Sequence, residues 1–131
     1  MLLPVTLSSC AAAGIICIWL GWRVGQLRGQ LGISHGDGGN EALLRRMRAQ
    51  LNFVEYTPFV LLLIAAIELA GKGGQWLVWV AAIYMLGRLA HPVGMDMAKS
   101  PAVPRMIGAT VTMIVLLGLS IYAALVAAGI A

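Results

Sequence analysis

Charged residues are scarce in this chain, and acidic residues are the scarcest. Asp and Glu together number five among 131 residues, charged residues make up 11% of the sequence, and 60% of it is hydrophobic. A soluble domain is about a quarter charged, so this composition indicates an integral membrane protein. The net charge of +4 is then better explained by loops that orient the chain in a bilayer than by nucleic acid, which we do not expect as a partner.

Cysteine is also rare, and the familiar catalytic motifs are missing. Cys10 and Cys17 lie seven residues apart in an apolar segment with no His or acid nearby. We therefore expect no metal site and no disulfide framework, only two small core residues. The sequence has no zinc-ligand spacing, no phosphate-binding loop and no Ser-His-Asp order.

Apolar segments occupy most of the chain. A transmembrane helix needs about 20 apolar residues, so the chain has room for about four of them and for no separate soluble domain. We predict an all-α fold, a four-helix integral membrane bundle that forms a single domain, residues 1–131. The predicted helices span about 3–29, 41–70, 76–97 and 102–130.

The first predicted helix has no basic residue ahead of its apolar run, and the first charged residue is Arg23. A secretory signal peptide carries positive charge before its apolar core, so we expect this helix to be retained. Arg23 and Arg28 are expected to extend to lipid headgroups. Glu68 and Lys72 are expected to form a surface pair of little energetic weight. The uncharged fourth segment is expected to serve packing only.

The charges of the loops predict the orientation in the membrane. Residues 23–48 carry five Arg against two acids, and residues 88–105 carry three cations against Asp96. The turn that contains Glu68 and Lys72 is neutral. Because basic loops remain on the cytoplasmic side, we expect both termini on the non-cytoplasmic side.

Polar residues enter the apolar part of the second predicted helix on one face. With about 100° of rotation per residue, Arg48, Asn52 and Glu55 lie within about 60° of one another. Ionisable groups at membrane depth are costly and mark candidate functional sites. A polar network between helices, with no ligand, is the alternative explanation of this face.

A second polar face lies on the third predicted helix, which runs antiparallel to the second. Tyr84, Arg88, His91 and Met95 follow one another at helical spacing, near the membrane side of Arg48. The two polar faces, together with Arg105, would form a site in which cations exceed acids: Arg48, Asn52, Glu55, Arg88, His91 and Arg105. Such a site suits a small anionic or zwitterionic ligand, and a lipophilic second substrate could arrive from the bilayer. For His91, a hydrogen bond in helix packing is an equally good explanation.

Two motifs carry a resemblance to a known family. The sequence Arg-Ala-Gln-x-Asn-Phe-x-Glu-Tyr-x-Pro at 48–58, with Gly-Arg-x-x-His-x-x-Gly at 87–94, resembles the MAPEG family (membrane-associated proteins in eicosanoid and glutathione metabolism), most closely its small bacterial members. The resemblance implies a homotrimer in the bacterial inner membrane, with glutathione between neighbouring subunits near the cytoplasmic side. By position in the motifs, it implies glutathione contacts from Arg48, Asn52, Glu55 and Arg88, with Tyr56 beside them.

The resemblance also implies a reaction. A microsomal-type glutathione S-transferase or peroxidase holds the glutathione sulfur as a thiolate, which attacks a lipophilic electrophile. An Arg at the start of the fourth helix favours the thiolate in the family, and Arg105 is the candidate here, although the spacing after Gly94 does not align cleanly. Eukaryotic members often have Tyr where this chain has Met95, which weakens any transfer of their eicosanoid chemistry.

Two other functions compete with a glutathione-dependent enzyme. A non-catalytic membrane binding or scaffold protein would keep the same fold and the same ligand face. A small multidrug transporter also has four spans in a short chain, but that class relies on an acid in its first helix. Residues 1–22 contain no acid, which argues against a transporter.

Overall fold

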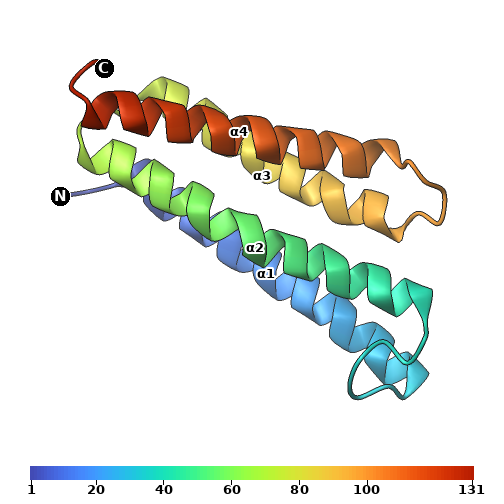
Figure 1. The fold of residues 1–131 in the computed structure, drawn as a ribbon. Coiled ribbons are helices and arrows are strands. Elements are labelled where there is room, and N and C mark those ends of the chain that lie inside the picture. Colours follow the sequence, from blue (N-terminus) through green and yellow to red (C-terminus); the bar gives the residue numbers. More distant parts are fainter.

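The computed structural model describes residues 1–131 and consists of four helices joined by short loops. The helices are α1 (Pro4–Leu31), α2 (Glu41–Leu69), α3 (Gln75–Asp96) and α4 (Val103–Ala127). They run alternately up and down, so both termini and the α2–α3 turn lie at one end of the bundle and the two longer loops at the other (Figure 1). The predicted all-α four-helix bundle is confirmed.

Each helix is long and apolar enough to cross a membrane. Their mean hydropathies run from 1.3 to 2.2, and the shortest helix, α3, has 22 residues. At 1.5 Å per residue α3 is about 33 Å long, which matches a hydrocarbon core of about 30 Å. The outward faces carry large apolar side chains such as Ile15, Leu62 and Ile114, each more than 60% exposed. This outer surface suits lipid rather than water.

The helix ends carry sequence signals that explain where they lie. Asn40 caps α2, because its Oδ1 accepts a hydrogen bond of 2.9 Å from the backbone N–H of Leu43, and Glu41 follows in the first turn. Asn is a preferred N-cap residue, and an acid in the first turn suits the positive end of the helix. Gly32 ends α1 with φ 67°, in the left-handed region that favours glycine.

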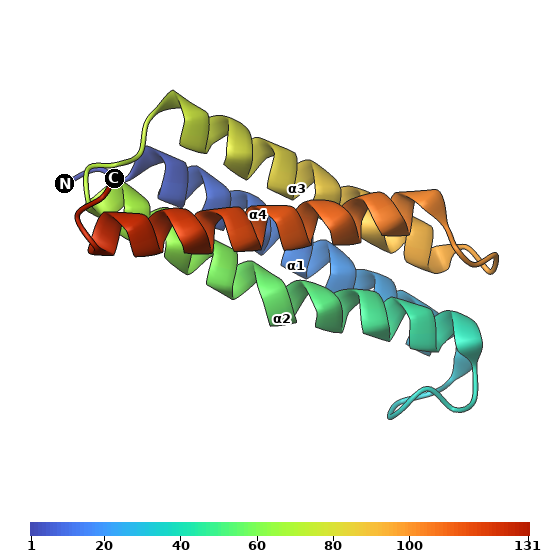
Figure 2. The same cartoon turned by 45° about the horizontal axis from the view of Figure 1, so that its top comes forward.

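The core lies where the four helices meet, and α3 contacts α4 most closely near the two longer loops. Val60, Ile64 and Leu77 are completely buried. A Cβ added to Gly108 of α4 would lie 2.6 Å from the carbonyl oxygen of Gly87 on α3. Only a glycine allows the two backbones to approach this closely. Figure 2 shows α3 separated from α4 on the side of the termini and crossing behind it toward the longer loops, while α1 and α2 form the other close pair.

Glu68 has a different role from the one predicted. Its carboxylate accepts hydrogen bonds from the backbone N–H groups of Val5 (3.0 Å) and Thr6 (2.8 Å) and from the Thr6 hydroxyl (2.7 Å). The prediction of a surface pair with Lys72 is therefore wrong. The first N–H groups of α1 have no partner within the helix and carry partial positive charge, so a carboxylate from α2 stabilises them.

Arg23 also departs from its prediction. Its side chain is 8% exposed and forms an ion pair with Asp96 at the end of α3, so it does not extend to lipid headgroups. The guanidinium lies over the ring of Trp19, 5.0 Å from the centroid, and Arg46 of α2 donates a 2.7 Å hydrogen bond to the Arg23 carbonyl. A charge with these partners joins the ends of three helices.

Cys10 and Cys17 are both free thiols. Cys10 is exposed on the outer side of α1 and Cys17 is partly buried, so the prediction of a core position is wrong for Cys10. The two thiols lie on a helix that is apolar all round, where the sequence alone does not distinguish a face toward lipid from a face toward the core.

Candidate functional site

A polar notch lies between α2, α3 and α4, toward the end of the bundle that carries the two longer loops. Its volume is about 90 Å³, and most of its lining is polar. The lining side chains are those of Arg48, Leu51, Asn52, Glu55, His91, Met95 and Arg105. Segments that are far apart in the sequence therefore meet at one place.

The notch brings together five of the seven predicted site residues. Arg48, Asn52 and Glu55 come from three successive turns of one face of α2, as their spacing indicates. His91 comes from α3, and Arg105 comes from the first turn of α4. The other two predicted residues, Arg88 and Tyr56, do not line it.

Arg88 lies behind Asn52 and is 1% exposed. Its Nη2 donates to Oδ1 of Asn52 at 2.8 Å, and its Nη1 donates to Oγ1 of Thr112 at 2.9 Å. The guanidinium also lies 5.7 Å from the ring centroid of Phe53. Both terminal nitrogens are thus engaged by protein partners, and one side chain connects α3 to α2 and α4.

This arrangement fixes the orientation of the Asn52 amide. Because the Asn52 oxygen accepts from Arg88, its amide nitrogen remains free to donate two hydrogen bonds. Asn52 lines the notch, so a ligand there would meet an amide donor. The ligand best suited to that donor has a carbonyl or carboxylate oxygen.

His91 is 3% exposed and its Nδ1 has no hydrogen-bond partner. It packs closely on α4, since a Cβ on Gly108 would lie 2.6 Å from the His91 Cβ. Buried polar atoms nearly always have a partner, and an exception at a site is a place where a ligand or water can bind. His91, which lines the notch, therefore keeps one unpaired ring nitrogen.

A further polar contact between α2 and α3 lies closer to the middle of the membrane than the notch. The hydroxyl groups of Tyr84 and Thr57 form a buried 2.8 Å hydrogen bond between α3 and α2. The sequence places Tyr84 on the polar face of α3, but it gives no role to Thr57. A hydroxyl pair of this kind has no charge to offer a ligand, so it serves to hold the two helices together.

Thr112 is the site residue that the sequence analysis missed. It is 1% exposed, accepts from Arg88, and donates to the carbonyl of Gly108 at 2.8 Å. The prediction that the fourth helix serves packing only is therefore wrong. A lone Thr in an apolar helix commonly bonds its own backbone four residues earlier, so its position carries no sequence signal for a second partner.

The side chains at the notch carry more positive than negative charge. Arg48, Glu55 and Arg105 are exposed, and Glu55 has no ion-pair partner within the chain. Two guanidinium groups and one carboxylate suit a zwitterion with excess negative charge. The volume of 90 Å³ is far below the roughly 300 Å³ of a small-molecule pocket, so the notch has room for only part of such a ligand.

Comparison with known proteins agrees with the motifs. The family model of the MAPEG family matches residues 6–125. The chain is also similar to the inner membrane protein YecN of Escherichia coli K12 and of Escherichia coli O6:H1, with 32% identity over 83 residues in each case. This match covers 63% of the chain and 63% of each relative's length. The chain therefore belongs to the MAPEG family, the membrane-associated proteins in eicosanoid and glutathione metabolism.

Proposed function

We propose that this protein binds glutathione and acts as a glutathione S-transferase or peroxidase on lipophilic electrophiles. The observation that carries the proposal is the convergence of Arg48, Asn52, Glu55 and Arg105 on one notch at the end of the bundle. A structural network would pair its charges within the chain, but none of these three charged side chains has an ion-pair partner there.

The side chains at the notch complement the charges of glutathione. Glutathione carries two carboxylates and one ammonium, and its excess of negative charge agrees with a notch that has two Arg and one Glu. Arg48 would bind a carboxylate through its planar fork, Glu55 would bind the ammonium, and the Asn52 amide would donate to a carbonyl or carboxylate oxygen. Arg88 would keep the Asn52 amide in that orientation through its 2.8 Å hydrogen bond.

Arg105 is the residue proposed to act on the sulfur. A thiol has a pKa of about 8.5 and reacts as the thiolate, and a neighbouring guanidinium favours the charged form. The thiolate would attack the electrophilic carbon, form a carbon–sulfur bond and expel the leaving group, while the thiol proton passes to water. Arg105 is exposed at the start of α4, so both water and a substrate from the bilayer can approach it.

The small volume of the notch supports a site shared between subunits. A tripeptide needs several times 90 Å³, and the outer faces of the helices carry apolar side chains that a neighbour could cover. We propose the homotrimer of the family as the functional unit. A neighbouring subunit would close the open side of the notch.

The distribution of charge supports the proposed orientation. The five Arg of residues 23–48 lie at the end with the notch, and the termini lie at the other end (Figure 1). We propose that the notch faces the cytoplasm of a bacterial cell and that both termini lie outside it. The relatives in Escherichia coli are named as inner membrane proteins, which supports the same membrane for this chain.

Calorimetry and an activity assay on the protein purified in detergent test the proposal together. Glutathione binding is measured first, and conjugation of glutathione to an activated aryl chloride second. Arg48→Ala should weaken binding, and Arg105→Ala should reduce turnover more than binding. Arg45→Ala is the matched control, because Arg45 lies at the same end but outside the notch and pairs only with Glu41, at 3.6 Å.

The possible outcomes separate the two remaining functions. Binding with turnover that depends on Arg105 supports the enzyme. Binding without turnover of aryl chlorides or of lipid hydroperoxides supports a non-catalytic binding or scaffold protein instead. Absence of glutathione binding in the wild-type protein would contradict both the activity and the assignment of the notch.

A further inference from the structure

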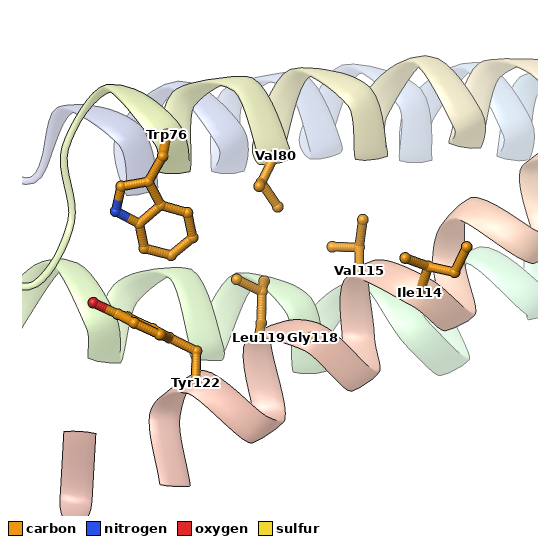
Figure 3. A pocket seen from close by; sticks show the side chains of 7 residues that line it. All are labelled: Trp76, Val80, Ile114, Val115, Gly118, Leu119 and Tyr122. Carbon is orange, nitrogen blue, oxygen red and sulfur yellow. The ribbon is translucent and has the colours of Figure 1, made fainter. Parts of the chain in front are cut away.

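A large apolar cavity lies far from the polar notch, between α3 and α4 near the end with both termini. It is an open groove of about 540 Å³ with an almost wholly apolar lining. Figure 3 shows Trp76 and Val80 of α3 facing side chains of α4 across it. The lining residues of α4 are Ile114, Val115, Gly118, Leu119 and Tyr122.

One residue in the wall of the groove has no side chain to fill it. Gly118 lies in its wall, and nothing lies within 4 Å of the place where a Cβ would stand. At the other end of the same helix pair, Gly87 and Gly108 bring the backbones into contact. Glycine therefore closes the α3–α4 interface at one end and leaves it open at the other.

The position of the groove along the membrane fits a lipid chain. Trp76 and Tyr122 lie at its mouth with ring centroids 5.0 Å apart in an edge-to-face arrangement, and such aromatic residues mark the level of the headgroups. From Tyr122 to Ile114 the groove follows eight residues of α4, about 12 Å. One leaflet of the hydrocarbon core is about 15 Å deep, so the groove covers most of one leaflet.

The backbone of a lysine lies beside the mouth of the groove. The Tyr122 hydroxyl donates to the backbone carbonyl of Lys72 at 3.4 Å, which places this exposed residue beside the aromatic pair. Glu68, the nearest acid in the sequence, is occupied by the start of α1, and Lys72 has no ion pair within the chain. Its ammonium is therefore available to an anion at headgroup level.

We propose that this groove binds an anionic phospholipid of the leaflet on the side of the termini. One acyl chain lies along Val80, Val115 and Leu119, and the phosphate pairs with Lys72. The groove is separate from the proposed site for the electrophile, because Ile114, its nearest lining residue on α4, lies nine residues from Arg105, about 13 Å along the helix. The proposal does not depend on glutathione binding.

Fluorescence quenching in vesicles tests the proposal at the groove itself. Trp76 is made the only tryptophan by Trp19→Phe, Trp22→Phe and Trp79→Phe, and circular dichroism checks the fold. Phosphatidylglycerol or phosphatidylcholine with the same brominated acyl chains is then added at equal mole fraction. An interaction with one Lys near the surface corresponds to about a fivefold preference for an anionic lipid. The apparent affinity of phosphatidylglycerol, measured by quenching of Trp76, should therefore be about fivefold higher than that of phosphatidylcholine.

Two variants separate the apolar and the charged part of the site. Gly118→Leu fills the groove, so quenching by both lipids should fall and the fivefold preference should vanish. Gly14→Leu is the matched control, since Gly14 lies outside the groove and also has nothing within 4 Å of an added Cβ; it should keep the preference. Lys72→Gln should keep quenching by phosphatidylcholine but lose the preference.

Three results would overturn the proposal. The first is equal quenching of the wild-type protein by the two lipids. The second is an unchanged preference in Gly118→Leu. The third is absence of quenching together with crosslinking of the groove residues to a second copy of the chain, which would show that a neighbouring subunit covers the groove.

Discussion

Arg88 and Asn52 are joined by a 2.8 Å hydrogen bond from the guanidinium Nη2 to the amide Oδ1. The cation is 1% exposed, while the amide lines the notch. A buried group on α3 thus sets the orientation of a group on α2 that lines the notch. Residues that hold Arg88 in place should therefore influence binding without touching the ligand.

Thr112→Val tests this influence from α4. The substitution keeps the shape of the side chain but removes an acceptor of Arg88, so a buried donor loses its partner. Hydrogen bonds between membrane helices contribute about 0.6 kcal/mol on average and up to about 1.7, and the loss should appear in thermal unfolding in detergent. Glutathione affinity should fall as well. Thr110→Val, at an exposed position of the same helix, should change neither quantity.

Glu68→Gln should loosen the start of α1. The amide has one acceptor oxygen where the carboxylate has two, so at least one of three hydrogen bonds from Val5 and Thr6 is lost. Loss of a helix N-terminal cap costs about 1 kcal/mol. Thermal unfolding and faster hydrogen exchange in residues 4–10 would measure the change. Equal destabilisation by Lys72→Gln would indicate that the Glu68–Lys72 pair matters after all.

Arg23 and Asp96 should show a coupling in a double-mutant cycle. Arg23→Gln, Asp96→Asn and the double variant remove the ion pair in steps. Because the Asp96 side chain is 42% exposed, we expect a coupling of about 1 kcal/mol, not the larger value of a fully buried pair. The exposed pair of Glu41 and Arg45 at 3.6 Å is the comparison, with an expected coupling of at most about 0.5 kcal/mol. A ranking in the opposite order would contradict the difference in burial.

Gly108→Ala should separate α3 from α4. The new methyl group would lie 2.6 Å from the Gly87 carbonyl oxygen, so the helices must move apart, at a cost of about 1–3 kcal/mol. The movement would also strain the contact between Arg88 and Thr112. Gly118→Ala is the control, because its Cβ meets open space and alanine favours the helix. Equal unfolding temperatures for the two variants would be evidence against the close approach at Gly108.

The sequence predicts the helices better than it predicts their contacts. Four long apolar runs with polar breaks determine four spans, and the spacing of Arg48, Asn52 and Glu55 determines a shared face. In the structure this face lies in one notch with Arg105, and the sequence analysis also places these residues in one site. Their role in binding glutathione stays a prediction.

The contacts of Arg23, Glu68 and Thr112 could not be predicted, for one physical reason. In a soluble bundle the apolar stripe of a helix shows which side faces its neighbours. In a membrane both lipid and core are apolar, so the pattern along α1 or α4 leaves the rotation of the helix undetermined. Only the packed structure shows that Glu68 meets the start of α1 and that Thr112 meets Arg88.

The polar contacts between helices also follow an order in time, because the chain is made from its N-terminus. The hydrogen bonds that Val5 and Thr6 donate to Glu68 involve only α1 and α2, so this helical hairpin can form them once α2 has left the ribosome and entered the membrane. The pair of Arg23 and Asp96 has to wait for the end of α3. Arg88 can donate its hydrogen bond to Thr112 only when α4 has entered the membrane. Until then Arg88 lacks one of its two hydrogen-bond partners. The helix that is synthesised last is therefore the one that completes the site.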